Sequence, residues 1–336
     1  MRAAGLATAM LLAALTGAAQ AQTPVKFSLD FKIDGTSAPF LLTLDKGYFQ
    51  AEGLNVTIDP GAGSLETIGR VASGTYDLGF ADINVLIKFR DANPDKPAVA
   101  VFMMYNKPPY AVIGRKSRGI RAPKDLEGKK LGAPAGDNSF AQWPIFVKAN
   151  GIDAAKVTIE NVSFPVREPM LAAGQVDAVT GRSFATFIDL KDKGVPVDDI
   201  TVLLMADFGV ELYGSAVIVN PKFAAAHPDA VKGFLRALLK GLKESVKQPS
   251  AAIESVMRRS DGTRKKDVEI ERLKLAISQN IVTAEVKANG FGGIDSARFA
   301  RGIEQLALTT KFKAKPKPNE IFDASYLPPA ADRKAN

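Results

Sequence analysis

The sequence contains no cysteine and only one histidine, His227, among its 336 residues. Disulfide bonds, thiolate nucleophiles and metal sites built from several histidines or thiolates are therefore excluded, and a Ser-His-Asp triad would depend on that single histidine. Pro228 follows His227 and is typical of the first turn of a helix. We therefore interpret His227 as a surface residue at the start of a helix.

Motifs for nucleotide chemistry are also missing. The chain has no GxxxxGK[ST] loop, and Gly61-Ala62-Gly63 lacks the third glycine of the dinucleotide-binding spacing. Paired carboxylates remain possible, but no spacing singles out one pair. An enzyme is therefore the minority interpretation, and we predict no catalytic residue, no metal and no cofactor.

Basic residues are not concentrated in one run, although the net charge is +8. Lysine and arginine are spread along the chain, which favours a solvated basic surface over a nucleic-acid interface. With 46% hydrophobic and 24% charged residues, the composition is that of an ordinary globular protein large enough for two lobes.

The N-terminal residues are typical of a secretory signal peptide. Arg2 precedes an apolar run that ends near Leu15, which is too short to span a membrane, and the small residues of Ala19-Gln20-Ala21 precede Gln22. We expect cleavage before Gln22 and export to a periplasm. Without cysteine there is no site for lipid attachment, so the mature protein is expected to be soluble.

Strand-like and helical segments alternate along most of the chain, which predicts α/β lobes with mostly parallel sheets covered on both faces. A first series of strands is expected, followed by a second α/β unit over roughly residues 116–207, then one more strand at 214–220 and helices to about residue 310. The predicted strands are 25–31, 54–60, 76–82, 98–106, 110–116, a strand within 122–136, 156–162, 176–182, 200–207 and 214–220. A helix start with a break at Pro144 is expected between the strands of the second unit.

This order predicts that a second lobe is inserted in the first. The expected division is a signal peptide at 1–21, a discontinuous first lobe at 22–111 and 214–336, and a second lobe at 112–213. Two chain crossings, near 111–115 and 207–214, would join the lobes.

Six segments together resemble one family, the solute-binding components of ABC importers, and within it the subgroup that binds sulfonates, nitrate and thiamine-pyrimidine precursors. They occur in the family's order and cover nearly the whole mature chain: SLDF, KGYFQAEGLNVTI, GSLETIGRVASGTYDLGFAD, DLEGKKLGAP, EPMLAAGQVDAVTG and SAVIVNPKFAAAHPDAVKGFLRAL. The resemblance implies the two-lobed periplasmic binding protein fold of type II, with a cleft that closes on a solute by hinge motion.

Candidate ligand-binding residues lie in the loops after the predicted strands, because open parallel sheets bind ligands at the carboxyl ends of their strands. The set is rich in aromatic and acidic residues: Asp30, Phe31, Ser37, Ser64, Asp82, Asn84, Tyr105, Asn106, Asp137, Ser139, Trp143, Arg182, Phe208, Glu211 and Tyr213.

Several of these residues have an alternative role. Asp30 could contact the ligand or merely cap a loop, and Trp143 could stack on the ligand or pack between the lobes. Ser64 and Ser139 are suited to capping helices. Arg182 could grip an anion through two hydrogen bonds or form a surface ion pair.

The predicted protein is a monomeric periplasmic receptor that delivers a small molecule to an inner-membrane ABC permease. Carboxylates beside aromatic faces favour a flat, nitrogen-bearing ring such as an aminopyrimidine. Leu29-Asp30-Phe31 resembles the Leu-Asp-Trp of pyrimidine-precursor binders, although Thr36 and Ser37 stand where that subgroup tends to carry a histidine.

Two alternatives remain open. One is a receptor for a sulfonate, nitrate or an aromatic carboxylate, which Arg182 would serve equally well. The other is an enzyme on the same fold that resembles eukaryotic pyrimidine synthases. The resemblance implies a cysteine-rich iron motif and a consumed active-site histidine for that enzyme, and this chain has no cysteine and only His227.

Overall fold

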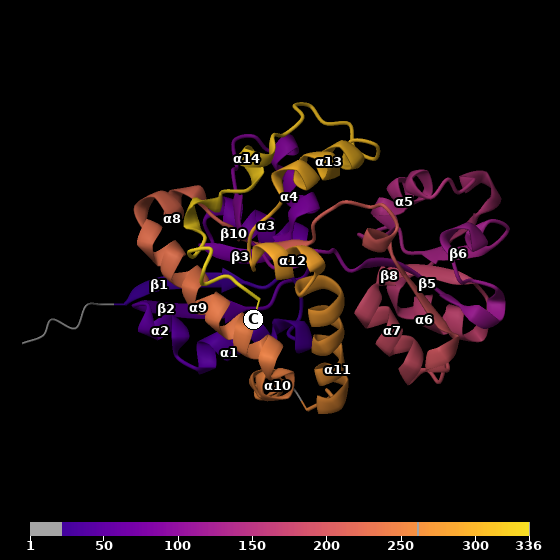
Figure 1. Cartoon of the computed structure of the whole chain (residues 1–336), viewed down its shortest axis with the longest axis horizontal. Coiled ribbons are helices and arrows are strands. Elements are labelled where there is room, and N and C mark those ends of the chain that lie inside the picture. The colour runs from indigo at the N-terminus through magenta and orange to yellow at the C-terminus, as the bar shows by residue number, and fades with distance from the viewer. Residues whose placement is uncertain (1–21, 261, 336) are drawn as a thin grey trace, which may run out of the picture.

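The computed structural model describes residues 22–260 and 262–335, so the predicted signal peptide at 1–21 lies outside the described residues. Two α/β lobes lie side by side (Figure 1). The first lobe contains β1 (Thr23–Ser28), α1 (Ala38–Asp45), α2 (Tyr48–Ala51), β2 (Leu54–Asp59), α3 (Ser64–Ser73), β3 (Leu78–Asp82), α4 (Ile83–Ala92), β4 (Val99–Met103), β10 (Ser215–Val219), α8 (Pro221–Ala226), α9 (Pro228–Lys247), α10 (Pro249–Met257), α11 (Lys266–Ala276), α12 (Ala284–Asn289), α13 (Ser296–Leu306) and α14 (Pro318–Ile321).

The second lobe is formed by the middle of the chain, which confirms the predicted insertion of one lobe in the other. Its elements are β5 (Tyr110–Arg115), β6 (Lys130–Ala133), α5 (Trp143–Ala149), β7 (Thr158–Asn161), α6 (Phe164–Ala173), β8 (Ala178–Arg182), α7 (Ser183–Asp192) and β9 (Ile200–Leu204). Residues 104–109 and 205–214 connect the two sheets, and we call them the crossing segments.

Each lobe has a five-stranded sheet that is mostly parallel with one reversed strand. The strand orders are β2-β1-β3-β10-β4 and β7-β6-β8-β5-β9. In the first sheet, β10 is antiparallel to both β3 and β4, and in the second sheet β5 is antiparallel to both β8 and β9. The amino ends of β5 and β10 therefore lie at the same sheet edges as the carboxyl ends of their neighbours.

The structure differs from the sequence-based expectation at Pro144 and at one lobe boundary. Pro144 was expected to interrupt a helix, but it is the second residue of α5, where its missing N–H is not needed. The predicted lobe boundary between residues 111 and 112 falls inside β5, which pairs with the second sheet from Tyr110 onward. The other predicted boundaries remain predictions.

Aromatic rings pack against one another in the core on one face of the first sheet. Phe27 packs against Phe40 and Phe234 with ring centroids 5.0 and 5.2 Å apart, so β1, α1 and α9 share one apolar interior. The long helix α9 packs its apolar side, which includes Leu235 and Leu238, against this face of the sheet. A second apolar cluster continues from the opposite face of the first sheet into the second lobe.

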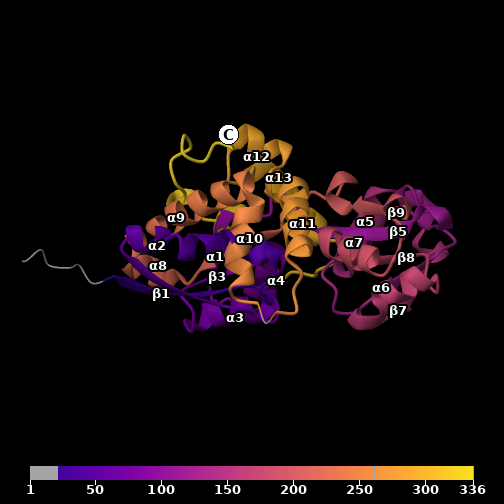
Figure 2. The ribbon, with the colours of Figure 1, turned by 90° about the horizontal axis from the view of Figure 1, so that it is seen from below.

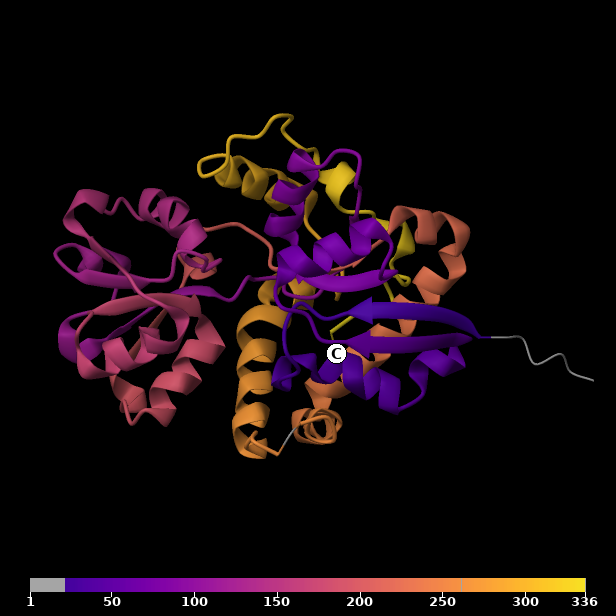
Figure 3. The same ribbon diagram turned by 180° about the vertical axis from the view of Figure 1, so that it is seen from behind.

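Helix α11 of the first lobe lies against α7 of the second lobe. Figures 2 and 3 show it beside α7. The Lys191 ammonium of α7 contacts both carboxylate oxygens of Glu271 in α11 at 2.9 and 2.8 Å. Within the described residues, no helix is both long and apolar enough to cross a membrane.

Candidate functional site

Charged residues from the two lobes meet between the sheets. Asp30 lies just beyond the carboxyl end of β1, and Arg182 is the last residue of β8. The Arg182 guanidinium nitrogen Nη2 lies 3.6 Å from the Asp30 carboxylate oxygen Oδ2, and its carbon lies 5.9 Å from the centre of the Phe31 ring. Two predicted residues of the first lobe and one of the second are therefore brought together.

The environment of Asp30 raises the pKa of its carboxyl group above the usual value. Its pKa is raised to about 6, mainly by burial; the Arg182 guanidinium lowers the pKa, and the nearby carboxylates Asp34 and Asp82 raise it. The Asp30 side chain is only 13% exposed. A carboxyl group that titrates near neutrality in an interlobe position is typical of functional sites.

Two tyrosines complete this cluster, and one of them was not predicted. Tyr105 lies in the first crossing segment beside Asp30 and Thr36, and burial raises the pKa of its hydroxyl. Tyr110 begins β5, pairs in register with Arg182 and donates a hydrogen bond to Asp82. We call Asp30, Phe31, Tyr105, Tyr110 and Arg182 the cleft cluster.

Predicted polar residues at the start of α4 serve the backbone. Asp82 caps this helix by accepting hydrogen bonds from the backbone N–H groups of Asn84 (2.8 Å) and Val85 (3.2 Å). The Asn84 side-chain amide donates to the Tyr213 carbonyl at 2.7 Å, and the Ser64 hydroxyl accepts from the Asp82 N–H at 3.1 Å. Because Tyr110 of the cleft cluster donates a hydrogen bond to Asp82, these contacts also fix the position of Tyr110.

Ser37 has a similar local role in the loop after β1. Its hydroxyl accepts a hydrogen bond from the Asp34 N–H at 3.4 Å, at the start of the short 3-10 helix Gly35–Ser37. The Gly35 N–H donates to the Glu269 carboxylate of α11 at 2.6 Å. This loop is therefore anchored to α11 beside the cleft cluster.

In the second lobe, Asp137 and Ser139 bind the end of β8. Asp137 accepts hydrogen bonds from the Thr180 hydroxyl (2.7 Å) and the Ser139 N–H (3.0 Å), and the Ser139 hydroxyl donates to the Gly181 carbonyl (2.8 Å). These bonds hold the backbone immediately before Arg182.

An unpredicted arginine lies beside this turn. Arg167, in α6, is largely buried and donates two hydrogen bonds to Glu168. Its Nη1 atom lies 3.7 Å from Asp137 Oδ2, and its guanidinium lies 5.7 Å from the centre of the Phe164 ring. A hollow of about 420 Å³, lined in part by Gly136 and Phe164, opens at this position.

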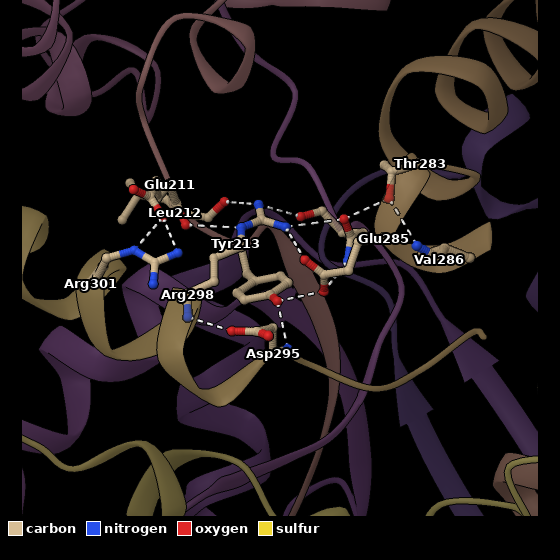
Figure 4. Close-up of polar contacts among 10 residues, drawn as sticks. Glu211, Leu212, Tyr213, Thr283, Glu285, Val286, Asp295, Arg298 and Arg301 are labelled. Atoms are coloured by element: carbon tan, nitrogen blue, oxygen red, sulfur yellow. Dashed lines mark hydrogen bonds and ion pairs between the residues drawn. The ribbon is translucent and has the colours of Figure 1, made fainter. Parts of the chain in front are cut away.

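Three other predicted residues belong to a separate polar network, shown in Figure 4. Its centre is Arg298 of α13, whose guanidinium donates to the carbonyl oxygens of Asn106 and Leu212 at 2.9 Å each and to Glu211 at 3.3 Å. The Asn106 side-chain oxygen accepts a further hydrogen bond from Arg298 at 3.1 Å. One side chain of the first lobe thus binds both crossing segments.

Tyr213 and Glu285 complete this network. The Arg298 guanidinium lies 4.0 Å from the centre of the Tyr213 ring and forms an ion pair with Glu285 at 2.9 Å. The Tyr213 hydroxyl donates to Glu285 at 2.6 Å and accepts from the Asp295 N–H at 2.8 Å. We call Asn106, Glu211, Tyr213, Glu285 and Arg298 the hinge cluster, and it uses the side chains of Asn106 and Tyr213 for internal bonds.

The two remaining predicted aromatic residues pack in the second lobe. Trp143 is 6% exposed and its ring centre lies 6.0 Å from that of Phe146. Phe146 makes an edge contact with Phe208 at 6.3 Å. Trp143 therefore packs within the second lobe and not between the lobes, and its role in ligand binding stays a prediction.

There are physical reasons why Tyr110 and Arg167 were not among the predicted residues. Tyr110 was missed because only carboxyl ends of strands were considered, whereas a reversed strand brings its amino end to the same edge. Arg167 was missed because it lies inside a helix, away from any predicted loop. Among residues 22–260 and 262–335, no group of three or more His, Asp or Glu side chains is arranged to hold a metal ion.

Comparison with known proteins assigns the family. The model of the NMT1/THI5-like family matches residues 35–252, and the chain belongs to that family. It is 24% identical over 297 residues to the riboflavin-binding protein RibY of Chloroflexus aurantiacus, covering 87% of this chain and 82% of that protein. It is 26% identical over 296 residues to the formylaminopyrimidine-binding protein of Halalkalibacterium halodurans, covering 85% and 86%.

Synthases also occur among the relatives. The 4-amino-5-hydroxymethyl-2-methylpyrimidine phosphate synthase of Aspergillus parasiticus is 26% identical over 226 residues, which cover 65% of each chain. In three dimensions the chain is similar to the periplasmic aliphatic sulphonate-binding protein SsuA of Escherichia coli, with a TM-score of 0.68, 14% identity and coverage of 85% and 91%. This likeness confirms the periplasmic binding protein fold.

Proposed function

We propose that this protein is a solute-binding receptor of an ABC importer and that it holds a small, flat, nitrogen-bearing heteroaromatic molecule at the cleft cluster. The observation that carries the proposal is the interlobe contact of Asp30 with Arg182, flanked by the rings of Phe31 and Tyr105. A solute that replaces this contact binds both lobes at once and so favours the closed form.

The chemistry of Asp30 fits a ring that donates hydrogen bonds. With a pKa of about 6, its carboxyl group is mostly ionised at neutral pH and accepts hydrogen bonds from amino or ring N–H groups. Phe31 is 45% exposed and offers a free aromatic face for stacking. The names of the relatives that bind riboflavin and a formylaminopyrimidine support the same ligand class.

An enzymatic function is the proposal's main alternative from another class, because several relatives are named as synthases. The cysteine-rich motif expected of such an enzyme has no counterpart in a chain without cysteine. His227 is exposed between α8 and α9, where its ring packs on Phe223 at 5.0 Å, as expected for a helix-start surface residue. These observations favour binding without catalysis.

An anion is the second candidate within the receptor class. Arg167 and Arg182 both lie near the carboxyl end of β8, and a sulfonate or carboxylate could form ion pairs with them. Against this, Glu168 and Asp30 already neutralise these arginines, and further carboxylates lie close by. An anion would therefore meet repulsion as well as attraction.

The proposal includes export, a periplasmic location, a monomeric receptor and delivery to an inner-membrane permease. It rests on the N-terminal sequence pattern and on the likeness to periplasmic binding proteins and ligand-binding components of import systems. N-terminal sequencing of periplasmic protein tests the export step. A chain that starts at Gln22 supports it, and a chain that still starts at Met1 contradicts it.

The ligand class is tested by mass spectrometry of small molecules released from natively purified protein, followed by calorimetry. The panel contains pyrimidines, riboflavin, taurine, alkanesulfonates, nitrate and aromatic acids. We expect heteroaromatic ligands to bind and Asp30→Asn to weaken them about 10- to 100-fold, because a charged hydrogen-bond acceptor is lost. Glu52→Gln, which breaks a distant surface pair with Arg236, is the matched control. Binding of anions alone, lost in Arg182→Ala and unchanged in Asp30→Asn, would overturn the ligand class.

A further inference from the structure

A π-helical turn, Ile277–Ile281, follows directly after α11. The Val282 N–H donates to the Ile277 carbonyl at 2.8 Å, which is the wider spacing of a π-turn. Such turns are rare and occur frequently at functional sites, because they redirect side chains that a regular helix would present elsewhere. Here Ser278 is exposed, Gln279 is half-buried and Asn280 is fully buried.

This turn lies where the first lobe meets both the second lobe and a crossing segment. The Ser183 hydroxyl of α7 donates to the Gln279 side-chain oxygen at 2.8 Å, and Ser183 directly follows Arg182 of the cleft cluster. The Lys107 N–H donates to the Asn280 carbonyl at 3.1 Å, and the Asn280 side-chain amide donates to the Lys107 carbonyl at 3.1 Å. Lys107 lies two residues after Tyr105, so the turn is bonded to residues that are close in sequence to two members of the cleft cluster, Arg182 and Tyr105.

One polar atom of this turn has no partner. Asn280 is 0% exposed, and its side-chain oxygen Oδ1 accepts no hydrogen bond from any described residue. In the described part of the chain, Gln142 Oε1 is the only other buried side-chain polar atom in this state. Buried acceptors are nearly always satisfied, so this oxygen requires a donor from outside the protein chain, which is either a water molecule or a bound solute.

We propose that Asn280 is a solute-binding residue whose Oδ1 accepts a hydrogen bond from an N–H group of the bound heteroaromatic ring. The inference rests on the proposed function and adds a specificity-determining residue to it. Gln279 then connects the same turn to Ser183 when the lobes are together. A site that pairs a buried acceptor with a ligand N–H discriminates strongly against rings without that donor, because the acceptor would be left unpaired.

The test uses two pairs of probes whose members differ in an N–H donor: 4-aminopyrimidine with pyrimidine, and riboflavin with N3-methylriboflavin. Dissociation constants are measured by calorimetry for wild type, Asn280→Leu and the neighbouring control Ser278→Ala. We expect wild type and the control to prefer the donor-bearing member of a pair at least about tenfold. Asn280→Leu is expected to bring that preference to within about twofold.

Further variants separate a binding role from a structural one. Asn280→Asp keeps an acceptor at the same position and is expected to retain the preference. Asn280→Ala replaces the leucine variant if the latter does not fold, as judged by its thermal transition. A lower melting temperature with an unchanged preference would mean that Asn280 holds an internal water or the backbone, and would overturn the assignment. Failure of wild type to bind either pair would overturn the heteroaromatic ligand as well.

Discussion

Two arginines, each in contact with a carboxylate, stand at the junction of the lobes and differ in how many of their donors are used. Arg298 of the hinge cluster donates to five oxygen atoms, stacks on Tyr213, and has a side chain that is only 16% exposed. Arg182 of the cleft cluster makes one loose ion pair at 3.6 Å, and its side chain is 38% exposed. Within the described residues it donates no hydrogen bond of standard length.

The two arginines therefore have different roles: the donors of Arg298 are used within the protein, and those of Arg182 are available to a solute. Three of the Arg298 bonds end on main-chain carbonyls of the two crossing segments, so the guanidinium is part of the backbone's own hydrogen bonding. Arg182 has unused donors in a position between lobes, which is what recognition of an external molecule requires. The fully used donors of Arg298 are typical of a structural residue, and the unused donors of Arg182 are typical of a ligand-binding residue.

The largest expected effect comes from Arg298→Ala. It removes the ion-pair partner of the partly buried Glu285 carboxylate and the donor of three crossing-segment carbonyls, so the free energy of unfolding should fall by about 3 kcal/mol. Urea unfolding followed by circular dichroism measures this. Arg301→Ala on the same helix removes only an exposed pair with Glu211 and should cost about 0.5 kcal/mol or less. Equal losses in the two variants would mean that the hinge cluster is no stronger than a surface pair.

A smaller effect is expected from pH at Asp30. Its pKa is about 6 in the folded protein and about 3.9 in the unfolded chain, so between these values the unfolded state ionises first. This contribution to stability is present below pH 4 and is lost as pH rises to about 6. Relative to Asp30→Asn, wild type should therefore lose about 2 kcal/mol of stability between pH 4 and pH 7. Parallel pH profiles of the two proteins would contradict the raised pKa.

The same titration bears on binding. If the ionised carboxyl group accepts hydrogen bonds from the solute, affinity should decrease below pH 6 by up to about tenfold per pH unit. Calorimetry at pH 5, 6 and 7 with a ligand that does not titrate in this range measures it. Asp30→Asn should show a flat profile.

Arg182→Ala should have a smaller effect on stability than Arg298→Ala. Its ion pair is long and partly exposed, so a change of about 1 kcal/mol or less is expected in the absence of solute. Thermal unfolding with and without bound solute checks this. A loss of stability as large as that of Arg298→Ala would place Arg182 among the structural residues.

The smallest expected effect concerns the contact between α7 and α11. Lys191→Met removes an exposed pair with Glu271 and should change stability by no more than about 0.5 kcal/mol. Because this pair joins the two lobes, the variant should still have a slightly larger radius of gyration by small-angle scattering without solute. Lys124→Met breaks the Glu127 pair within the second lobe and should leave that radius unchanged.

The alternation of strands and helices was sufficient to predict the two lobes, because each buried strand and each amphipathic helix has its own periodicity. The reversal of β5 and β10 was not predictable in this way, since side-chain alternation is the same in either strand direction. That reversal is the reason Tyr110 was missed. The inserted second lobe was nevertheless predicted, because β10 restarts the first lobe after a long interval.

For the site, strand ends located Asp30 and Arg182, but proximity to a strand end does not show where a side chain points. Asn106 and Tyr213 follow from the same rule and instead bind α12 and α13. The competing partners, Glu285 and Arg298, come from helices that lie 70 or more residues further along the chain. No local sequence pattern in the crossing segments predicts these two partners.

The position of β10 has a consequence for the order in which the chain is made. β3 and β4 are synthesised early, but they are joined only through β10, which lies more than 100 residues later. The second sheet, in contrast, is complete once residue 204 has been made. During synthesis the sheet of the first lobe therefore remains incomplete until β10 has been made, while the inserted second lobe can already fold.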